Sequence, residues 1–259
     1  MKYTDHNAAV WDEWASTGCP WTIPCTSEDI QRAKAGDWGV YLTPIIPVPK
    51  EWFAPYLKNN SLTGCKILGL ASGGGQQMPI FAVLGAECTV LDYSESQLQK
   101  ERDVRAREGY AIEIVRADMT ERLPFDDASF DLIFHPVSNC YVENVRHVWD
   151  ECARVLRPGG LLLAGFSNGI DFLFEDEHPL RVANKLPFNP LRLSEKERER
   201  VLENDGAYFF SHTLEEQIGG QLKAGFRLTD LREDRDRPDA AAAIAAYYPQ
   251  YLLTRAIAE

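Results

Sequence analysis

The sequence lacks any long hydrophobic run. Within its 259 residues no apolar stretch approaches the roughly 20 residues that a helix needs to cross a bilayer. The N-terminus also lacks the charged segment and apolar core of a secretory signal. We therefore expect a cytoplasmic protein with no membrane partner.

Basic residues are fewer than acidic residues. The chain has 27 Lys and Arg against 39 Asp and Glu, a formal net charge of -12. Such an excess opposes general attraction to nucleic-acid phosphates, and no segment resembles a nucleic-acid recognition module. We expect no nucleic-acid partner.

The six cysteines include no CxxC pair. They are Cys19, Cys25, Cys65, Cys88, Cys140 and Cys152. Several lie in apolar stretches, as small buried hydrophobic residues do. We expect reduced thiols and no metal site.

Residues 1–60 differ in composition from the rest of the chain. They contain five of the six tryptophans, namely Trp11, Trp14, Trp21, Trp38 and Trp52. We interpret this segment as an N-terminal lid or cap, and residues 61–259 as the main domain. The length suits one large α/β domain with insertions.

From residue 66 onward, short β-rich runs alternate with helical patterns. Predicted strands cover residues 66–70, 87–92, 111–116, 131–135 and 161–166, and helices cover residues 76–84 and 94–109. A further helix has one apolar face and ends at Pro158-Gly159-Gly160; the face is formed by Val145, Val148, Trp149, Cys152 and Leu156. This alternation predicts a parallel sheet with helices on both faces.

The alternation stops at residue 167. An apolar and acidic stretch (Phe172, Phe174, Glu175, Asp176, Glu177) and a charged helical run at 194–204 predict an inserted cap over about 167–212. Thr213 with Glu216 then opens a capped helix, and residues 226–231 and 247–257 predict a final antiparallel strand pair. The expected fold is a Rossmann-like, seven-stranded, mostly parallel sheet.

The first predicted strand leads into a glycine loop, Ala71-Ser72-Gly73-Gly74-Gly75. A strand that turns through glycines into a helix presents free N–H groups to a ligand. Taken alone, the loop is equally compatible with a tight turn. Asp92 ends the second strand, where a carboxylate accepts from ribose hydroxyls in nucleotide-binding folds.

A second carboxylate follows the third strand. Asp118 is placed to accept from an adenine amino group, and Met119 to pack on the ring. The alternative is that Asp118 caps its own loop.

Five segments together resemble a known family. They are residues 66–75, Leu91-Asp92-Tyr93-Ser94, Ala117-Asp118-Met119, residues 123–131 and residues 155–160. Their order and spacing resemble a class I S-adenosylmethionine-dependent methyltransferase of the small-molecule, type 11 kind. The resemblance implies S-adenosylmethionine as cofactor and in-line methyl transfer to a small molecule.

The same resemblance implies roles for single residues. Gly73 and Gly75 would approach the methionine part of the cofactor, Asp92 would hold the ribose, and Tyr93 would flank the adenine with Met119. His135 and the residues after it would line the methionine and substrate side. The predicted cofactor-binding residues are Ala71, Ser72, Gly73, Gly75, Gln76, Gln77, Asp92, Tyr93, Ser94, Gln97, Asp118, Met119, His135 and Trp11.

Two positions depart from the family pattern. The family has an acidic residue where this chain has Gly69, and a glycine where it has Ala71. The missing carboxylate removes a usual indirect partner of the methionine ammonium group.

Methyl transfer requires a general base only if the acceptor starts protonated. His135 is the predicted catalytic residue, with Tyr141, His178 and His212 as other candidates. Trp11 and Trp14 would share a helical face in a lid that attracts the sulfonium; the alternative is a segment simply packed on the core.

Other functions compete with this interpretation. An NAD-dependent oxidoreductase would use Asp92 equally well, but its motif needs a glycine where Gln76 stands. A protein of this fold that binds the cofactor without transferring a methyl group is the other alternative. We expect a monomer or a homodimer, and the acceptor is left open.

Overall fold

The computed structural model describes residues 2–174, 180–236 and 243–259. Its strands are β1 (Lys66–Leu70), β2 (Glu87–Asp92), β3 (Glu113–Arg116), β4 (Phe130–His135), β5 (Leu156–Ser167), β6 (Phe226–Asp234) and β7 (Tyr251–Ala258). Its helices are α1 (Tyr3–Thr17), α2 (Ser27–Lys34), α3 (Met78–Val83), α4 (Glu95–Glu108), α5 (Val145–Val155), α6 (Glu195–Asp205) and α7 (Leu214–Lys223). Short 3-10 helices include η3 (Asn139–Tyr141) and η6 (Ala243–Ala246).

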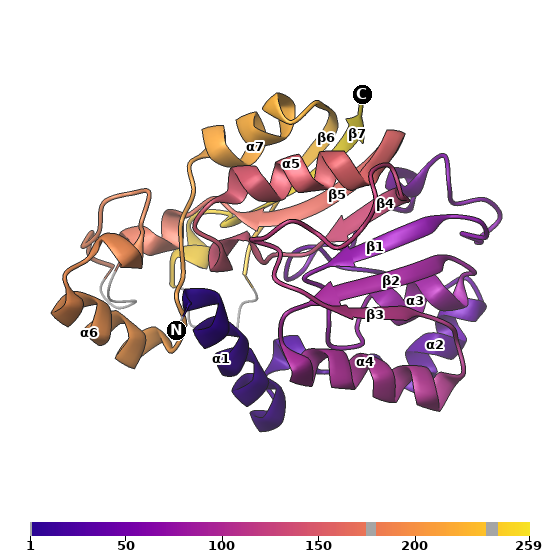
Figure 1. Cartoon of the computed structure of the whole chain (residues 1–259), viewed down its shortest axis with the longest axis horizontal. Helices are drawn as coiled ribbons and strands as arrows, with labels where there is room; N and C mark the ends of the chain where they lie inside the picture. The colour runs from indigo at the N-terminus through magenta and orange to yellow at the C-terminus, as the bar shows by residue number, and fades with distance from the viewer. Residues whose placement is uncertain (1, 175–179, 237–242) are drawn as a thin grey trace.

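The seven strands form one sheet in the order β3-β2-β1-β4-β5-β7-β6. Strands β1 to β5 pair in parallel, while β7 lies antiparallel to both β5 and β6. The predicted Rossmann-like sheet with an antiparallel last pair is confirmed (Figure 1).

Helices cover both faces of the sheet because its strands are apolar on both sides. On one face, α2, α3 and α4 pack over a core in which Phe81 contacts Phe134, with ring centroids 5.1 Å apart. On the other face, α5 supplies Trp149, which contacts Phe166 at 6.3 Å. Gly220 lets α7 approach α5, because a Cβ there would lie 2.7 Å from Trp149 Cδ1.

Several predicted boundaries are wrong, including the start of β3 at Glu113 rather than residue 111 and the end of β6 at Asp234 rather than residue 231. β5 begins at Leu156, which pairs with Phe130 and therefore leaves the helix face where we had placed it. α3 begins at Met78 rather than residue 76, because the preceding glutamines bind the N-terminal segment. β7 begins at Tyr251 rather than residue 247, because the amides of Tyr247 and Tyr248 close the turn after η6 by donating to the Ile244 carbonyl at 2.8 and 3.0 Å.

The first 60 residues divide into two parts in the structure. Helix α1 lies over the carboxyl ends of the strands (Figure 1). From α2 onward the chain joins the main core, where Ile30, Trp52 and Phe53 are at most 2% exposed. The lid interpretation therefore concerns α1 and the loop after it.

The inserted segment contacts α1. Asn7 exchanges two hydrogen bonds with the backbone of Tyr208, at 2.9 and 2.7 Å, and His6 contacts the Gly206 carbonyl at 2.8 Å. Glu175, Asp176, Glu177 and His178 of the predicted cap lie outside the described residues.

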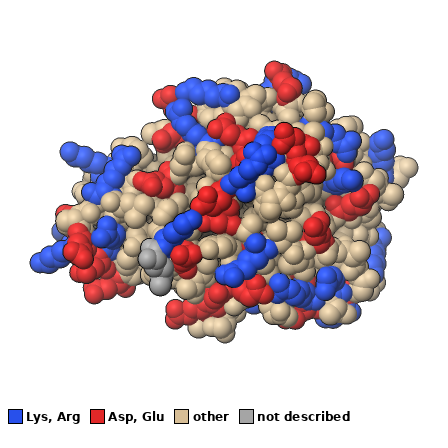
Figure 2. All heavy atoms as spheres, in the orientation of Figure 1, with Lys and Arg blue, Asp and Glu red and all other residues tan. Residues whose placement is uncertain are grey.

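The described surface is mixed in charge. On the face in Figure 2, basic side chains lie among acidic ones, and no continuous basic surface forms among the residues described there. None of the described helices is long and apolar enough to cross a membrane. Within the described ranges, no three His, Cys, Asp or Glu side chains are grouped to hold a metal ion.

Candidate active site

A cavity of about 1290 Å³ opens at the carboxyl ends of β1, β2 and β4, beneath α1. Its wall combines the glycine loop and the ends of β2 and β3 with a group of aromatic side chains. Pockets for one small molecule typically have volumes of about 300 to 1,000 Å³. This cavity therefore has room for two molecules side by side.

The glycine loop turns tightly against the end of β2. The Gly73 amide donates to Asp92 Oδ2 at 2.9 Å. A Cβ at Gly73 would lie 2.8 Å from the same oxygen and 2.9 Å from Gln97 Cβ. Ala71 has a φ of 48°, a left-handed conformation that favours glycine. The structure thus explains why the family prefers glycine at both positions.

Asp92 presents a carboxylate that is already held in place. Oδ2 accepts from Gly73 N, and Oδ1 accepts from Ser94 N at 3.0 Å. Burial raises the pKa of Asp92, and the backbone hydrogen bonds oppose that shift. Each carboxylate oxygen has a second lone pair, so Asp92 can also accept from two ligand hydroxyls.

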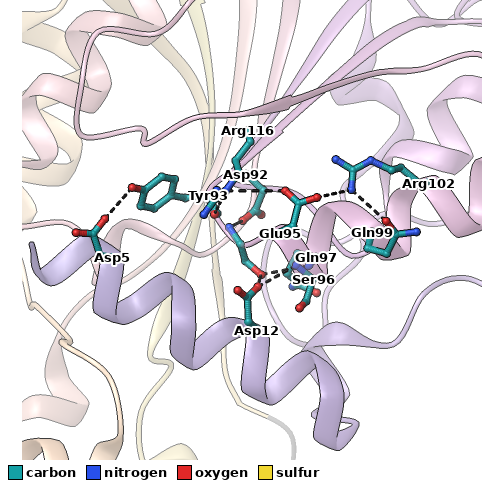
Figure 3. Close-up of polar contacts among 11 residues, drawn as sticks. Asp5, Asp12, Asp92, Tyr93, Glu95, Ser96, Gln97, Gln99, Arg102 and Arg116 are labelled. Carbon is teal, nitrogen blue, oxygen red and sulfur yellow. Dashed lines mark hydrogen bonds and ion pairs between the residues drawn. The ribbon is translucent and has the colours of Figure 1, made fainter. Parts of the chain in front are cut away.

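Helix α1 is tied to the residues around Asp92 (Figure 3). Asp12 accepts from Ser94 Oγ at 2.6 Å and from the Ser96 amide at 2.9 Å, at the N-terminus of α4. Asp5 accepts from the Tyr93 hydroxyl at 2.8 Å. These contacts hold α1 over the part of the cavity that contains Asp92, and neither Asp5 nor Asp12 had been predicted as a site residue.

Three buried polar atoms of the lining have no hydrogen-bond partner among the described residues. They are Thr4 Oγ1, Ser72 Oγ and Gln97 Oε1, on residues that are 5 to 8% exposed. A buried polar group without a partner costs about 1 to 3 kcal/mol. These atoms, together with the close approach that Gly73 permits, fit a polar ligand lying along the loop.

The predicted adenine side also lines the cavity. Asp118 Oδ1 accepts from Thr120 N at 2.9 Å and from Thr120 Oγ1 at 2.7 Å, so this carboxylate does cap its own loop. Met119 is 9% exposed and packs in the same apolar cluster as Leu91. Both residues lie in the wall, beside Asp92 and Tyr93.

The family resemblance implies that Gly75, Gln76 and Gln77 contact the cofactor, but in the structure all three contact other parts of the protein. Gly75 is outside the lining, and a Cβ there would lie 2.8 Å from Val104 Cγ2 of α4, so glycine serves packing. Gln76 Nε2 donates to the Trp21 carbonyl at 2.9 Å. Gln77 Oε1 accepts from the Tyr41 amide at 3.0 Å. The glutamines line the cavity but also anchor the segment after α1.

The packing around Gly69 leaves no room for the acidic side chain that the family has at this position. A Cβ at Gly69 would lie 2.8 Å from Met78 Cγ. The Met78 side chain occupies the space that a longer residue would need.

His135 lies beneath the cavity and is fully buried. Its Nδ1 donates to the Leu70 carbonyl at 2.9 Å, and its Nε2 lies 2.9 Å from Asn139 Oδ1. Burial lowers its pKa. His212 is buried as well, with Nε2 3.0 Å from the Asn139 carbonyl. Neither imidazole lines the cavity.

Aromatic side chains line the other half of the cavity. Trp11 contacts Trp14 and Tyr141, with ring centroids 5.1 and 5.5 Å apart. Phe209 lies 5.0 Å from Tyr141. Trp11 and Trp14 thus share a helical face, as predicted, and that face looks into the cavity.

Comparison with known proteins agrees with this geometry. Residues 68–164 match the methyltransferase domain family. The uncharacterized methyltransferase YbaJ of Bacillus subtilis is 41% identical over 257 residues, covering 97% of this chain and 97% of YbaJ.

Solved structures show the same fold. An S-adenosylmethionine-dependent methyltransferase from Mesorhizobium loti superposes with a TM-score of 0.59 at 21% identity, covering 78% of this chain and 93% of that one. A chain from the complex between the Haloferax volcanii Trm112 methyltransferase activator and a putative methyltransferase has a TM-score of 0.57 at 18% identity, covering 95% and 96%. With the glycine loop, Asp92 and the strand order in agreement, this chain belongs to the class I S-adenosylmethionine-dependent methyltransferases.

Proposed function

We propose that this chain is an enzyme that transfers the methyl group of S-adenosylmethionine to a small-molecule acceptor. The observation that carries the proposal is one continuous cavity, in which a polar part around Asp92 continues into an aromatic part beneath α1. The cavity volume of about 1290 Å³ exceeds what one ligand needs.

In the cofactor half, we assign Asp92 to the ribose hydroxyls, because both of its oxygens are oriented by backbone amides. Tyr93 and Met119 would border the adenine, with Asp118 at its amino group. Ser72 and Gln97 supply unpartnered polar atoms beside the loop.

The bound cofactor supplies an electrophilic methyl group on a sulfonium. The residues of this chain orient the two reactants and exclude water, and such positioning contributes about 7 to 11 kcal/mol in favourable cases. Burial raises the pKa of Tyr141 well above its usual value, so this phenol stays neutral at physiological pH and is a poor base.

We assign His135 a supporting role in place of the catalytic one predicted from sequence. Its ring bridges the end of β1 and η3, directly under the loop that follows β4. Both ring nitrogens of this buried imidazole are hydrogen-bonded, so the ring fixes the position of η3 relative to β1. It has no free nitrogen to accept a proton from the methyl acceptor.

The enclosure of the aromatic half on two sides favours a small acceptor over a large one. Helix α1 and the inserted segment both contribute to its wall, through Trp11, Trp14 and Phe209. The net charge of -12 opposes a nucleic-acid substrate. We further propose that α1 acts as the lid, since Asp5 and Asp12 fasten it beside the ribose site.

Two measurements test the proposal. Calorimetric titration with S-adenosylhomocysteine should give binding, and titration with NAD should give none. Incubation with methyl-labelled S-adenosylmethionine and small amines, alcohols, thiols and carboxylates should then label at least one class. NAD binding in place of S-adenosylhomocysteine would refute the cofactor assignment, and binding without transfer to any class would favour a cofactor-binding protein that is not a methyltransferase.

A further inference from the structure

We propose that helix α1 is part of the cofactor site, and that the Thr4 hydroxyl forms a hydrogen bond with the adenosine of the bound cofactor. The inference rests on the proposed placement of the cofactor and adds a binding residue from outside the glycine loop and the strand ends. It follows from an unpartnered hydroxyl, from the face of α1 that carries it, and from the segments that hold the first turn of α1.

Thr4 has a hydroxyl that the described part of the protein leaves unused. Its side chain lines the cavity, and the residue is 8% exposed. Oγ1 is buried and has no hydrogen-bond partner among the described residues. Asn7, one turn further along α1 and also in the wall, has both of its amide atoms bonded to the Tyr208 backbone. Native proteins rarely leave a buried polar group unpaired, so the ligand is the partner that Thr4 requires.

The side chains of α1 that face the cavity share one side of the helix. Thr4, Ala8 and Trp11 are four and three positions apart, so their side chains lie above one another along the helix. All three line the cavity. The Ala8 side chain ends at its Cβ and therefore leaves room beneath the helix. A ligand under α1 meets the Thr4 hydroxyl at one end of this face and the Trp11 ring at the other.

The first turn of α1 is held beside the segments assigned to the adenine. Asp5 accepts from the Tyr93 hydroxyl at 2.8 Å (Figure 3). Lys2 Nζ donates to Glu121 Oε1 at 2.6 Å. Glu121 directly follows residues 118–120, which line the cavity. The unpartnered hydroxyl belongs to the residue between these two anchors, so it enters the cavity at the end formed by Tyr93 and residues 118–120.

A third anchor holds the opposite side of the same turn. The Glu143 amide donates to the Tyr3 hydroxyl at 3.1 Å, and the Tyr3 ring lies 5.2 Å from the Phe210 ring. With contacts on both sides of the helix, the backbone at Thr4 is fixed relative to the sheet. Adenosine offers ring nitrogens that accept and amino and hydroxyl groups that donate. A threonine hydroxyl both donates and accepts, so it can pair with either kind of group.

The contact connects cofactor binding to the wall of the aromatic half. Thr4 and Trp11 belong to one helix, and the Trp11 ring lies 5.5 Å from the Tyr141 ring. A ligand that binds Thr4 therefore also restrains Trp11. Saturating S-adenosylhomocysteine should slow proteolysis of α1 in the wild type. Absence of protection would contradict a contact between α1 and the cofactor.

Thr4→Val tests the hydrogen bond, because valine keeps the shape of threonine and lacks the hydroxyl. We expect the dissociation constant of S-adenosylhomocysteine, measured by calorimetric titration, to rise about three- to tenfold, the usual contribution of one hydrogen bond. Thr4→Ser keeps the hydroxyl and should bind nearly as the wild type does. Thr17→Val is the matched control, since Thr17 is exposed in the last turn of α1 and outside the described lining. Unchanged affinity in Thr4→Val would overturn the inference.

The stability of the ligand-free protein separates binding from a structural role. Oγ1 has no partner among the described residues, so valine removes no hydrogen bond and replaces a buried polar group with an apolar one. We expect the melting temperature of Thr4→Val without ligand to equal or exceed that of the wild type, while its affinity falls. A lower melting temperature together with the loss of affinity would show that Thr4 acts through the fold, and would overturn the contact.

Titration with 5′-methylthioadenosine locates the contact on the ligand. This compound keeps the adenosine and the sulfur and lacks the amino-acid part of the cofactor. We expect Thr4→Val to weaken its binding by the same factor as that of S-adenosylhomocysteine. A loss seen only with S-adenosylhomocysteine would place Thr4 at the amino-acid part and refute the adenosine contact.

Methyl-transfer assays distinguish this inference from the proposed function. Wild-type affinity in a Thr4→Val protein that still methylates an acceptor would refute the Thr4 contact and support the methyltransferase. Weaker binding by Thr4→Val, in a protein whose wild type methylates no amine, alcohol, thiol or carboxylate, would support the contact and count against methyl transfer.

Discussion

Gly73→Ala is the sharpest test of how the loop and Asp92 cooperate. The added Cβ would lie 2.8 Å from Asp92 Oδ2, 2.9 Å from Gln97 Cβ and 3.1 Å from Asp92 Cβ. These distances are well inside ordinary carbon contacts, so Asp92 must move. Its movement also lengthens the 2.9 Å hydrogen bond from the Gly73 amide.

Overpacking of this kind typically costs about 1 to 3 kcal/mol. If Asp92 orients the ribose, most of that cost falls on cofactor binding, because the loop is free to relax when the ligand is absent. A loss of about 1 to 3 kcal/mol in binding free energy corresponds to a 5- to 150-fold larger dissociation constant. Calorimetric titration with S-adenosylhomocysteine measures it.

Gly219→Ala provides the matched control. Gly219 lies within α7, and a Cβ there would be 3.5 Å from Glu215 Cγ, an ordinary contact. This variant should gain about 0.5 to 1 kcal/mol of stability and bind the ligand as the wild type does. Wild-type affinity in Gly73→Ala would refute the assignment of Asp92, since the carboxylate cannot stay in place beside the new methyl group.

Three further predictions concern α1, His135 and Glu101. Asp12→Ala should lower stability by about 1 kcal/mol, because it removes two hydrogen bonds between α1 and the N-terminus of α4, and it should speed proteolysis of α1, whereas the exposed Glu13→Ala should do neither. Unchanged cleavage in Asp12→Ala would show that the hydrogen bonds to Ser94 and Ser96 do not hold α1 in place. His135→Gln should cost about 1 to 3 kcal/mol in the free energy of unfolding and leave the shape of the pH–rate profile unchanged; a shifted profile at wild-type stability would restore the catalytic role. Burial raises the pKa of Glu101 from 4.5 to about 7, so the folded protein keeps a proton that the unfolded chain loses, and stability falls between those pH values. The stability of Glu101→Gln relative to the wild type should therefore rise by up to about 3 kcal/mol from pH 4.5 to pH 7 in chemical denaturation, and a pH-independent difference would rule out the raised pKa.

Much of the cofactor half could be predicted from the sequence. The observed bounds of β1 and β2 equal the predicted ones, because short apolar runs ended by turn residues define strands locally. Once those strands are parallel neighbours, Asp92 and the glycine loop must meet at one edge of the sheet. Asp118 reaches the same cavity for the same reason.

For two of the predicted site residues, the structure shows contacts that the local sequence does not reveal. Gly75 matched a binding pattern, yet its missing side chain makes room for Val104. His135 ends β4 at the right position, but its ring turns under the sheet edge toward Leu70. A pattern of glycines and strand ends records position along the chain and not the direction of a side chain.

The sequence by itself determined the succession of strands and helices along the chain and the position of Asp92 at the end of β2, because apolar periodicity and turn residues act over a few positions. Its motifs were enough to indicate the family. Only the tertiary structure decided which residues close the cavity. Asp12 meets Ser94 from 82 positions away, and Asp236 joins Trp11 in one cavity wall from the opposite end of the chain. Such pairings depend on how α1, β6 and β7 pack around the sheet, and that packing leaves no local pattern in the sequence.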